Sequence, residues 1–136
     1  MKKTFTLIEI LVVATIIGLL ASGGVVVYTE LNKGARDAKR KTDLEQIRAA
    51  LEMYRSNNNE YYSGTFNNNC QNITWLSNYL SSIPNDPKAN SGYYYRCNIS
   101  QSDYTLGAYL ETGGSESCGS CGSFNCNYCV GPYGQR

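Results

Sequence analysis

The chain opens, over residues 2–29, with KKTFTLIEILVVATIIGLLASGGVVVYT. Two lysines precede the apolar part, and the twenty residues from Ile10 to Thr29 carry no charge. At 1.5 Å per residue, a helix of that length measures about 30 Å, which is the thickness of the hydrocarbon core of a bilayer. These residues therefore predict a single membrane-spanning helix near the N-terminus.

A cleavable secretory signal peptide is the alternative for the same residues. Lys2 and Lys3 would be its basic region, and Ala21-Ser22-Gly23 would offer small residues to a signal peptidase. The apolar run is longer than that of a typical signal peptide, and a carboxylate, Glu9, stands at its start. We therefore favour a retained span.

Residues 2–13, KKTFTLIEILVV, closely resemble the class III signal of type IV prepilins and type II secretion pseudopilins. In that family a prepilin peptidase removes a short basic leader before a Phe and N-methylates the new terminus. The resemblance places the cut between Thr4 and Phe5. The family has Gly before the cut where this chain has Thr4, so cleavage, slow cleavage and retention as a membrane-anchored precursor all stay open.

Glu9 is the residue in this segment that calls for an explanation. An ionised carboxylate inside a bilayer is costly, and such groups usually have a function and a partner of opposite charge. The resemblance implies that the partner is the amine of Phe5 in a neighbouring subunit, so that pairing sets the register of a growing filament. The alternative is an interfacial Glu9 whose side chain reaches the polar edge of the membrane. We favour the assembly role.

Three glycines, Gly18, Gly23 and Gly24, are expected to weaken this helix, because each interior Gly costs about 1 kcal/mol relative to Ala. Gly18 and Ser22 have the spacing of small residues at closely packed helix pairs. The family resemblance instead implies local unwinding when subunits enter a filament. The sequence does not separate these two interpretations.

A second helical segment follows Gly34, where apolar residues recur every three or four positions. They are Leu44, Ile47, Leu51 and Tyr54. This spacing marks one face of an amphipathic helix, which we expect to cover the globular domain. The Asn-rich residues 56–59 are predicted to end the helix.

The charged residues of this segment are predicted to form a solvated face opposite the apolar one, with pairs at helical spacing. These pairs are Asp37 with Lys41 and Glu45 with Arg48. Five cations also follow the span within nine residues: Lys33, Arg36, Lys39, Arg40 and Lys41. Such a cluster can bind DNA or anionic lipid headgroups, but a solvated helix face is its more usual role, so nucleic acid is not expected as a partner.

The positive-inside rule alone would place the C-terminal side in the cytoplasm, whereas the cysteines and the family resemblance favour the exterior.

The remaining residues predict a small mixed domain. Residues 73–80 have apolar positions at helical spacing and predict a short helix, and residues 84–87 predict a turn. Two segments, 93–99 and 103–111, alternate in polarity and predict a two-stranded antiparallel hairpin. The order of long helix, Asp-Pro turn and Tyr-rich hairpin also resembles that of pilins and major pseudopilins.

All six cysteines lie beyond residue 69. From Ser56 onward there are only eight Ile, Leu or Val residues, which make a small aliphatic core, and an even cysteine count in a small exported domain favours disulfides. We expect Cys70 to pair with Cys97 and the last four to pair among themselves, although six cysteines allow fifteen pairings. The last four are Cys118, Cys121, Cys126 and Cys129. They could instead hold a metal, but residues 122–125 alone separate the two Cys-x2-Cys pairs, which is too close for a zinc ribbon.

These features together predict an α+β, pilin-like fold, in which a long N-terminal helix packs on a small antiparallel sheet with a cysteine-rich C-terminal loop. The expected parts are a leader over residues 1–4, a transmembrane and assembly helix over 5–31 and an amphipathic half over 32–56. A disulfide-stapled globular domain is expected over 57–136.

The function that these features favour is structural. We expect a single-pass protein of the cytoplasmic membrane that polymerises into a type IV pilus-like filament at the cell surface. The alternatives are a major pseudopilin of a type II secretion system and, from another class, a membrane-anchored metal or redox protein. The chain has no His and shows no nucleophile and base set, so neither enzyme activity nor a cofactor is expected. The resemblance implies as partners other copies of the chain, a prepilin peptidase and the pilus assembly machinery.

Overall fold

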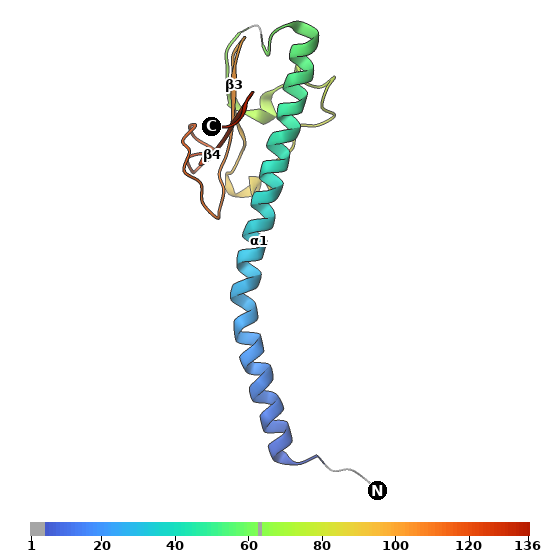
Figure 1. Ribbon diagram of the computed structural model, residues 1–136, viewed down its shortest axis with the longest axis vertical. Coiled ribbons are helices and arrows are strands. Elements are labelled where there is room, and N and C mark those ends of the chain that lie inside the picture. Colours follow the sequence, from blue (N-terminus) through green and yellow to red (C-terminus); the bar gives the residue numbers. More distant parts are fainter. Residues whose placement is uncertain (1–4, 63) are drawn as a thin grey trace.

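The computed structural model describes residues 5–62 and 64–136, and it consists of one long helix with a β-sheet domain on the C-terminal half of that helix (Figure 1). The N-terminal half projects away from the domain (Figure 1). The predicted leader, including Thr4, lies outside the described residues. The predicted α+β pilin-like fold is confirmed.

Helix α1 extends over Leu7–Asn58. Its first turn is closed by a capping box, in which the Thr6 side chain accepts the Glu9 N–H and the Glu9 side chain accepts the Thr6 N–H. Its C-terminal cap, Asn59, has a φ of 59°, a left-handed conformation that Asn adopts more readily than most residues. The predicted end of the helix in the Asn-rich run is therefore confirmed. The helix continues without a break through Gly18, Gly23 and Gly24.

The domain contains one antiparallel sheet with the strand order β1-β2-β3-β4-β5. The strands are β1 (Phe66–Asn69), β2 (Arg96–Ile99), β3 (Tyr104–Ala108), β4 (Tyr128–Gly131) and β5 (Gly134–Gln135). The predicted hairpin is confirmed as β2 and β3, which pair Cys97 with Leu106 and Ile99 with Tyr104. Each strand is shorter than its predicted segment. Strands β1, β4 and β5 were not predicted, because β1 is rich in Asn and the strand-favouring Tyr128 and Val130 of β4 stand within a tail rich in Gly and Cys.

The predicted helix over residues 73–80 is wrong. A 3-10 helix, η1 (Cys70–Asn72), comes first and ends at Ile73, whose backbone is extended, and a turn occupies residues 75–79. Cys70 is fixed to β2 by its disulfide with Cys97, and Ile73 and Leu76 are buried in the core, so these tertiary contacts and not the local periodicity determine the path of the segment. The turn predicted at 84–87 lies two residues later, where Asp86 accepts the N–H of Lys88 and precedes the 3-10 helix η2 (Ala89–Ser91).

The hydrophobic core lies between α1 and the inner face of the sheet. Leu44, Ile47 and Leu51 are fully buried, as the predicted stripe requires, and Tyr54 is partly buried beside them. The opposing side chains come from alternate positions of β2 and β3: Tyr95, Cys97, Ile99, Tyr104, Leu106 and Ala108. This packing fixes which face of the sheet is turned away from the helix.

The outer face of the sheet is covered by the cysteine-rich tail at Gly107. A Cβ atom at Gly107 would lie 2.9 Å from the Sγ atoms of both Cys118 and Cys126. Glycine at this position therefore leaves the space in which two disulfides pack on β3.

Replacing Gly107 with Val should lower the free energy of unfolding by about 1–3 kcal/mol, because the two sulfurs are held by disulfides and cannot easily move aside. Urea unfolding of the oxidised, detergent-solubilised protein, followed by the fluorescence of its single Trp, would measure the change. Gly34→Ala is the control: its Cβ would meet nothing within 4 Å, and a helix-interior Gly→Ala change should stabilise by up to about 1 kcal/mol. Equal unfolding midpoints for Gly107→Val and the unaltered protein would contradict the packing.

Candidate functional site

The first part of the candidate site is the apolar N-terminal half of α1. Within the described residues, α1 is long and apolar enough to cross a membrane, and its most apolar 18-residue window is entirely exposed. Phe5, Leu7, Leu19 and Leu20 each expose more than 70% of their surface. Large apolar surfaces that stay exposed in a folded chain mark contact with lipid or protein.

Glu9 lies in the first turn of this exposed half. Its Oε2 atom accepts hydrogen bonds from the backbone N–H and the hydroxyl of Thr6, both at 2.9 Å. Beside it, Phe5, Ile8, Val12 and Val13 line a shallow apolar hollow. In the single subunit the carboxylate thus has local N–H and O–H donors, and its pairing with a neighbour's amine stays a prediction.

The second part is a buried ion cluster where α1 enters the domain. Arg40 is fully buried, and its guanidinium contacts three carboxylates: Asp86 at 2.7 Å, Asp37 at 2.8 Å and Glu111 at 2.9 Å. The Asp86 contact is two-pronged, from Nε and Nη2. A buried charge is stable only when it is paired and hydrogen-bonded, and the three carboxylates meet that need.

Two further cations complete this cluster. Arg36 donates two hydrogen bonds of 2.7 Å to Glu111, and Lys88 donates one of 2.8 Å to the same carboxylate. The cluster therefore contains three cations and three carboxylates, so its formal charges cancel. Among the five cations predicted to be solvated, Arg40 is buried, Arg36 binds Glu111, and Lys33 pairs with Glu30 at 2.7 Å.

The prediction that Asp37 belongs to a solvated face is wrong. Asp37 is 4% exposed and accepts the backbone N–H groups of Glu111 at 2.9 Å and of Thr112 at 2.8 Å. It also accepts the Thr112 hydroxyl at 2.7 Å. The helical spacing with Lys41 misled the prediction, because the partners of Asp37 are Arg40, on the same helix, and two residues more than seventy positions away, Glu111 and Thr112. Glu45 and Arg48, by contrast, are paired at the surface as predicted.

The surroundings of Glu111 and Asp37 lower the pKa of both carboxyl groups. Hydrogen bonds from Arg36, and then from Lys88 and Arg40, hold the pKa of Glu111 far below its ordinary value. Burial raises the pKa of Asp37, but the N–H groups of Glu111 and Thr112, together with Arg40, lower it overall. Both groups are therefore ionised at neutral pH.

Tyrosine hydroxyls add two attachments farther along α1. Tyr95 donates to Asp43 at 2.7 Å from the inner face of the sheet. Tyr104 and Tyr61 donate to Glu52 at 2.8 and 3.0 Å, respectively. The helix is thus attached to the domain by polar contacts at three levels as well as by the core.

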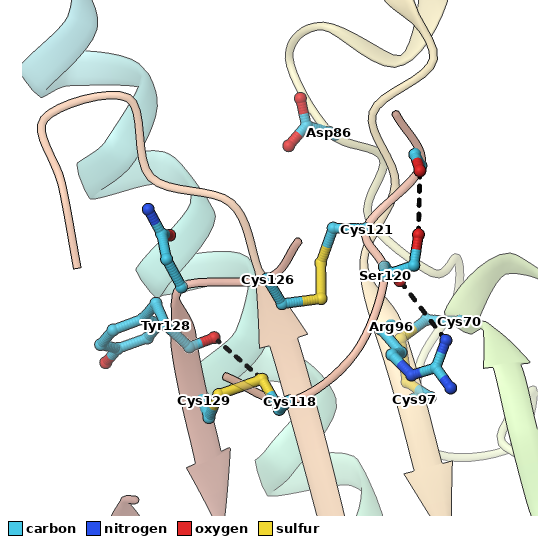
Figure 2. Close-up of a disulfide and its surroundings, with 12 residues drawn as sticks. Cys70, Asp86, Arg96, Cys97, Cys118, Ser120, Cys121, Cys126, Tyr128 and Cys129 are labelled. Atoms are coloured by element: carbon cyan, nitrogen blue, oxygen red, sulfur yellow. Dashed lines mark hydrogen bonds between the residues drawn. A yellow bond between two sulfur atoms is a disulfide. The ribbon is translucent and has the colours of Figure 1, made fainter. Parts of the chain in front are cut away.

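The six cysteines form three disulfides, drawn in Figure 2: Cys70–Cys97, Cys118–Cys129 and Cys121–Cys126. The sequence analysis favours the Cys70–Cys97 bond and pairing of the last four cysteines among themselves, and it leaves open which of these four pair. The last two bonds are nested, and Arg96 donates to the Ser120 carbonyl of the same loop at 3.5 Å (Figure 2). Every described cysteine is oxidised, so none of the four in the tail is a thiolate available to a metal.

The residues that sequence reasoning missed are Asp86 and Glu111. Asp86 was read as part of a turn and Glu111 as the end of a strand, and nothing in their spacing links them to Arg40. The one available signal was that cations outnumber acidic residues directly after the span. Any of these cations that became buried would therefore need a carboxylate from elsewhere in the chain.

An exposed apolar helix half, attached through a neutral ion cluster to a disulfide-stapled sheet, is the architecture of a pilin-like filament subunit. No family model matches the sequence, and no solved structure matches it. The chain is similar to the type II secretion system core protein G of Pseudomonas aeruginosa, with 33% identity over 137 aligned positions that cover 91% of this chain and 96% of the relative. The chain belongs to the family of type IV pilins and type II secretion pseudopilins.

Replacing Glu111 with Gln should lower the free energy of unfolding by about 3–5 kcal/mol at pH 7, because it leaves buried cationic charge without its partner. The pKa of Glu111 is lower in the folded state than its ordinary value of about 4.3 in the unfolded chain. Its contribution to stability is therefore complete above the unfolded-state pKa and is lost as the pH falls from there through the folded-state pKa. The gap between the variant and the unaltered protein should therefore narrow from pH 7 to pH 3 in urea unfolding.

The matched control is Glu45→Gln, which removes one partner of the exposed Glu45–Arg48 pair. Surface pairs contribute about 0–1 kcal/mol, so this variant should stay close to the unaltered protein at both pH values. A Glu111→Gln effect that is no larger than the Glu45→Gln effect would show that the cluster does not hold the domain on the helix.

Proposed function

We propose that this chain is the major pseudopilin of a type II secretion system, a structural subunit that polymerises into a short filament anchored in the cytoplasmic membrane. The observation that carries the proposal is its similarity to a secretion core protein G over nearly the whole length of both chains. The sequence features alone favour a surface pilus, and the relative favours the secretion pseudopilin over it.

The geometry suggests how such a subunit would work. Before assembly, the exposed apolar half of α1 lies in the membrane, and the domain stays outside it. During assembly the lipid contacts are exchanged for contacts with the same helix of other copies. Glu9, with the apolar hollow beside it, would receive the amine of Phe5 from a neighbour. The partners would be other copies, a prepilin peptidase and the secretion machinery.

Deleting the gene and measuring exported proteins separates the two filament classes. We expect secreted enzymes to accumulate in the periplasm while surface pili stay unchanged in number by electron microscopy. Loss of surface pili with normal secretion would contradict the proposal and favour a type IV pilin.

Replacing Glu9 with Gln should abolish filament formation while leaving the protein in the membrane, because the amide keeps the size of the side chain and removes its charge. Filaments sheared from overexpressing cells, compared with the membrane-bound pool on immunoblots, would show the effect. Glu30→Gln is the control, because Glu30 also lies on α1 but pairs with Lys33 of its own chain. Equal filament yields for the two variants would exclude a register role for Glu9.

Material isolated from assembled filaments should begin at an N-methylated Phe5, which N-terminal mass spectrometry would detect. Thr4→Gly should speed the conversion of precursor to mature protein in a pulse-chase measurement, because it restores the residue that the family has before the cut. Filaments composed of chains that begin at Met1 would contradict processing at this position.

A further inference from the structure

Three aromatic rings of the domain stack on one another outside its hydrophobic core. The ring centroid of Phe124 lies 4.9 Å from that of Tyr93 and 4.8 Å from that of Tyr109, with angles of 27° and 25° between the ring planes. Tyr93 and Tyr109 are 5.7 Å apart. We call Tyr93, Tyr109 and Phe124 the aromatic platform.

The platform is held by a rigid frame. Phe124 lies in the loop that the Cys121–Cys126 disulfide closes, and the Phe124 carbonyl accepts the Cys121 N–H at 2.8 Å. The bridge of Tyr93 with Gly122 attaches the loop to the segment before β2, and the bridge of Ser120 with Asn125 joins the two ends of the loop. Because the loop is already ordered, a partner that bound it would lose little conformational entropy.

Phe124 is nonetheless 40% exposed. Large aromatic side chains that stay exposed on a rigid support are typical of interface hot spots. The guanidinium of Arg40 and the ammonium of Lys88 lie 5.5 and 5.7 Å from the centre of the Tyr93 ring. The platform therefore lies beside the ion cluster, at the end of the domain where the apolar half of α1 leaves it.

The opposite side of the same helix segment carries exposed, uncharged residues, of which all but Met53 are small. They are Ala35, Ala38, Thr42, Ala49 and Met53. At 100° per residue these positions lie about half a turn around α1 from Leu44, Ile47 and Leu51, which face the sheet. They continue the exposed surface of the N-terminal half, and the small side chains of Ala35, Ala38, Thr42 and Ala49 would let an aromatic ring approach the helix closely. We call these five residues the outer strip.

We propose that the aromatic platform of one subunit docks on the outer strip, within residues 35–53 of α1, in a second copy of the chain. The platform contacts Arg40 on the inner side of α1, so it cannot reach the outer strip of its own helix. A patch that binds a different patch on an identical copy makes a heterologous contact, which produces a filament when the rotation between copies does not close into a ring. The inference rests on the proposed function, because the docking would add a contact between domain and helix to the helix–helix interface of the proposed filament.

The test places a photoreactive benzoylphenylalanine at position 124 in the full-length chain and irradiates cells that assemble filaments. We expect cross-linked dimers, and mass spectrometry should map the second attachment to residues 35–53. Position 133 is the matched control, because Tyr133 is 96% exposed in the β4–β5 turn and should give no such product. A third probe at Ile16, in the exposed apolar half, reports assembly itself.

The outcomes separate the two proposals. Dimers from position 16 would show that filaments assemble. If the probe at position 124 then attached to lipid, to another protein or to another region of the copy, the docking would be overturned and the filament function would stand. No dimers from position 16 would overturn both. Phe124→Ser should also lower the filament yield at least tenfold relative to Tyr133→Ser, at an unchanged membrane-bound level and with all three disulfides formed. Equal yields would overturn the docking.

Discussion

A single buried guanidinium determines how the two parts of this molecule are joined. Arg40 has no exposed surface, and its charge is balanced by carboxylates from α1, from the Asp86 turn and from the segment after β3. Removing water from such a charge is costly unless each of its partners is in position. The helix, the turn and the chain end of β3 can therefore adopt only one arrangement, and the Tyr95 and Tyr104 contacts farther along α1 keep it.

The arrangement divides the helix into two halves with opposite requirements. The C-terminal half is satisfied within the chain, because its apolar stripe is covered by the sheet and its buried charges are paired. The N-terminal half is satisfied only by an environment outside the chain, either lipid or other copies of the same helix. A subunit whose C-terminal half makes its contacts within the chain, and whose N-terminal half needs contacts from outside, can reside in a membrane and then move into a polymer.

Local patterns in the sequence predicted the features that depend on neighbouring residues. The apolar span, the Leu44–Leu51 stripe, the Asn-rich helix end and the alternation of β2 and β3 each follow from spacing alone. The ion cluster could not be predicted, because Arg40 meets Asp86 and Glu111 across 46 and 71 residues of chain. The helix expected over residues 73–80 failed for a similar reason, since a disulfide from Cys70 to the sheet outweighs a short periodic pattern. Strand β1 was missed because three of its four residues are Asn, and only pairing with β2 makes them a strand.

The positions of the disulfides have a mechanical consequence. All three join residues between 70 and 129, and none attaches α1 to the sheet. When a polymer of such subunits is stretched, tension along the helix passes into each domain through non-covalent contacts and one short connecting segment. The sheet itself is reinforced by covalent bonds. The joint between helix and sheet therefore has no covalent reinforcement, whereas the three disulfides would keep their parts of the domain linked to one another if the sheet were pulled from its helix.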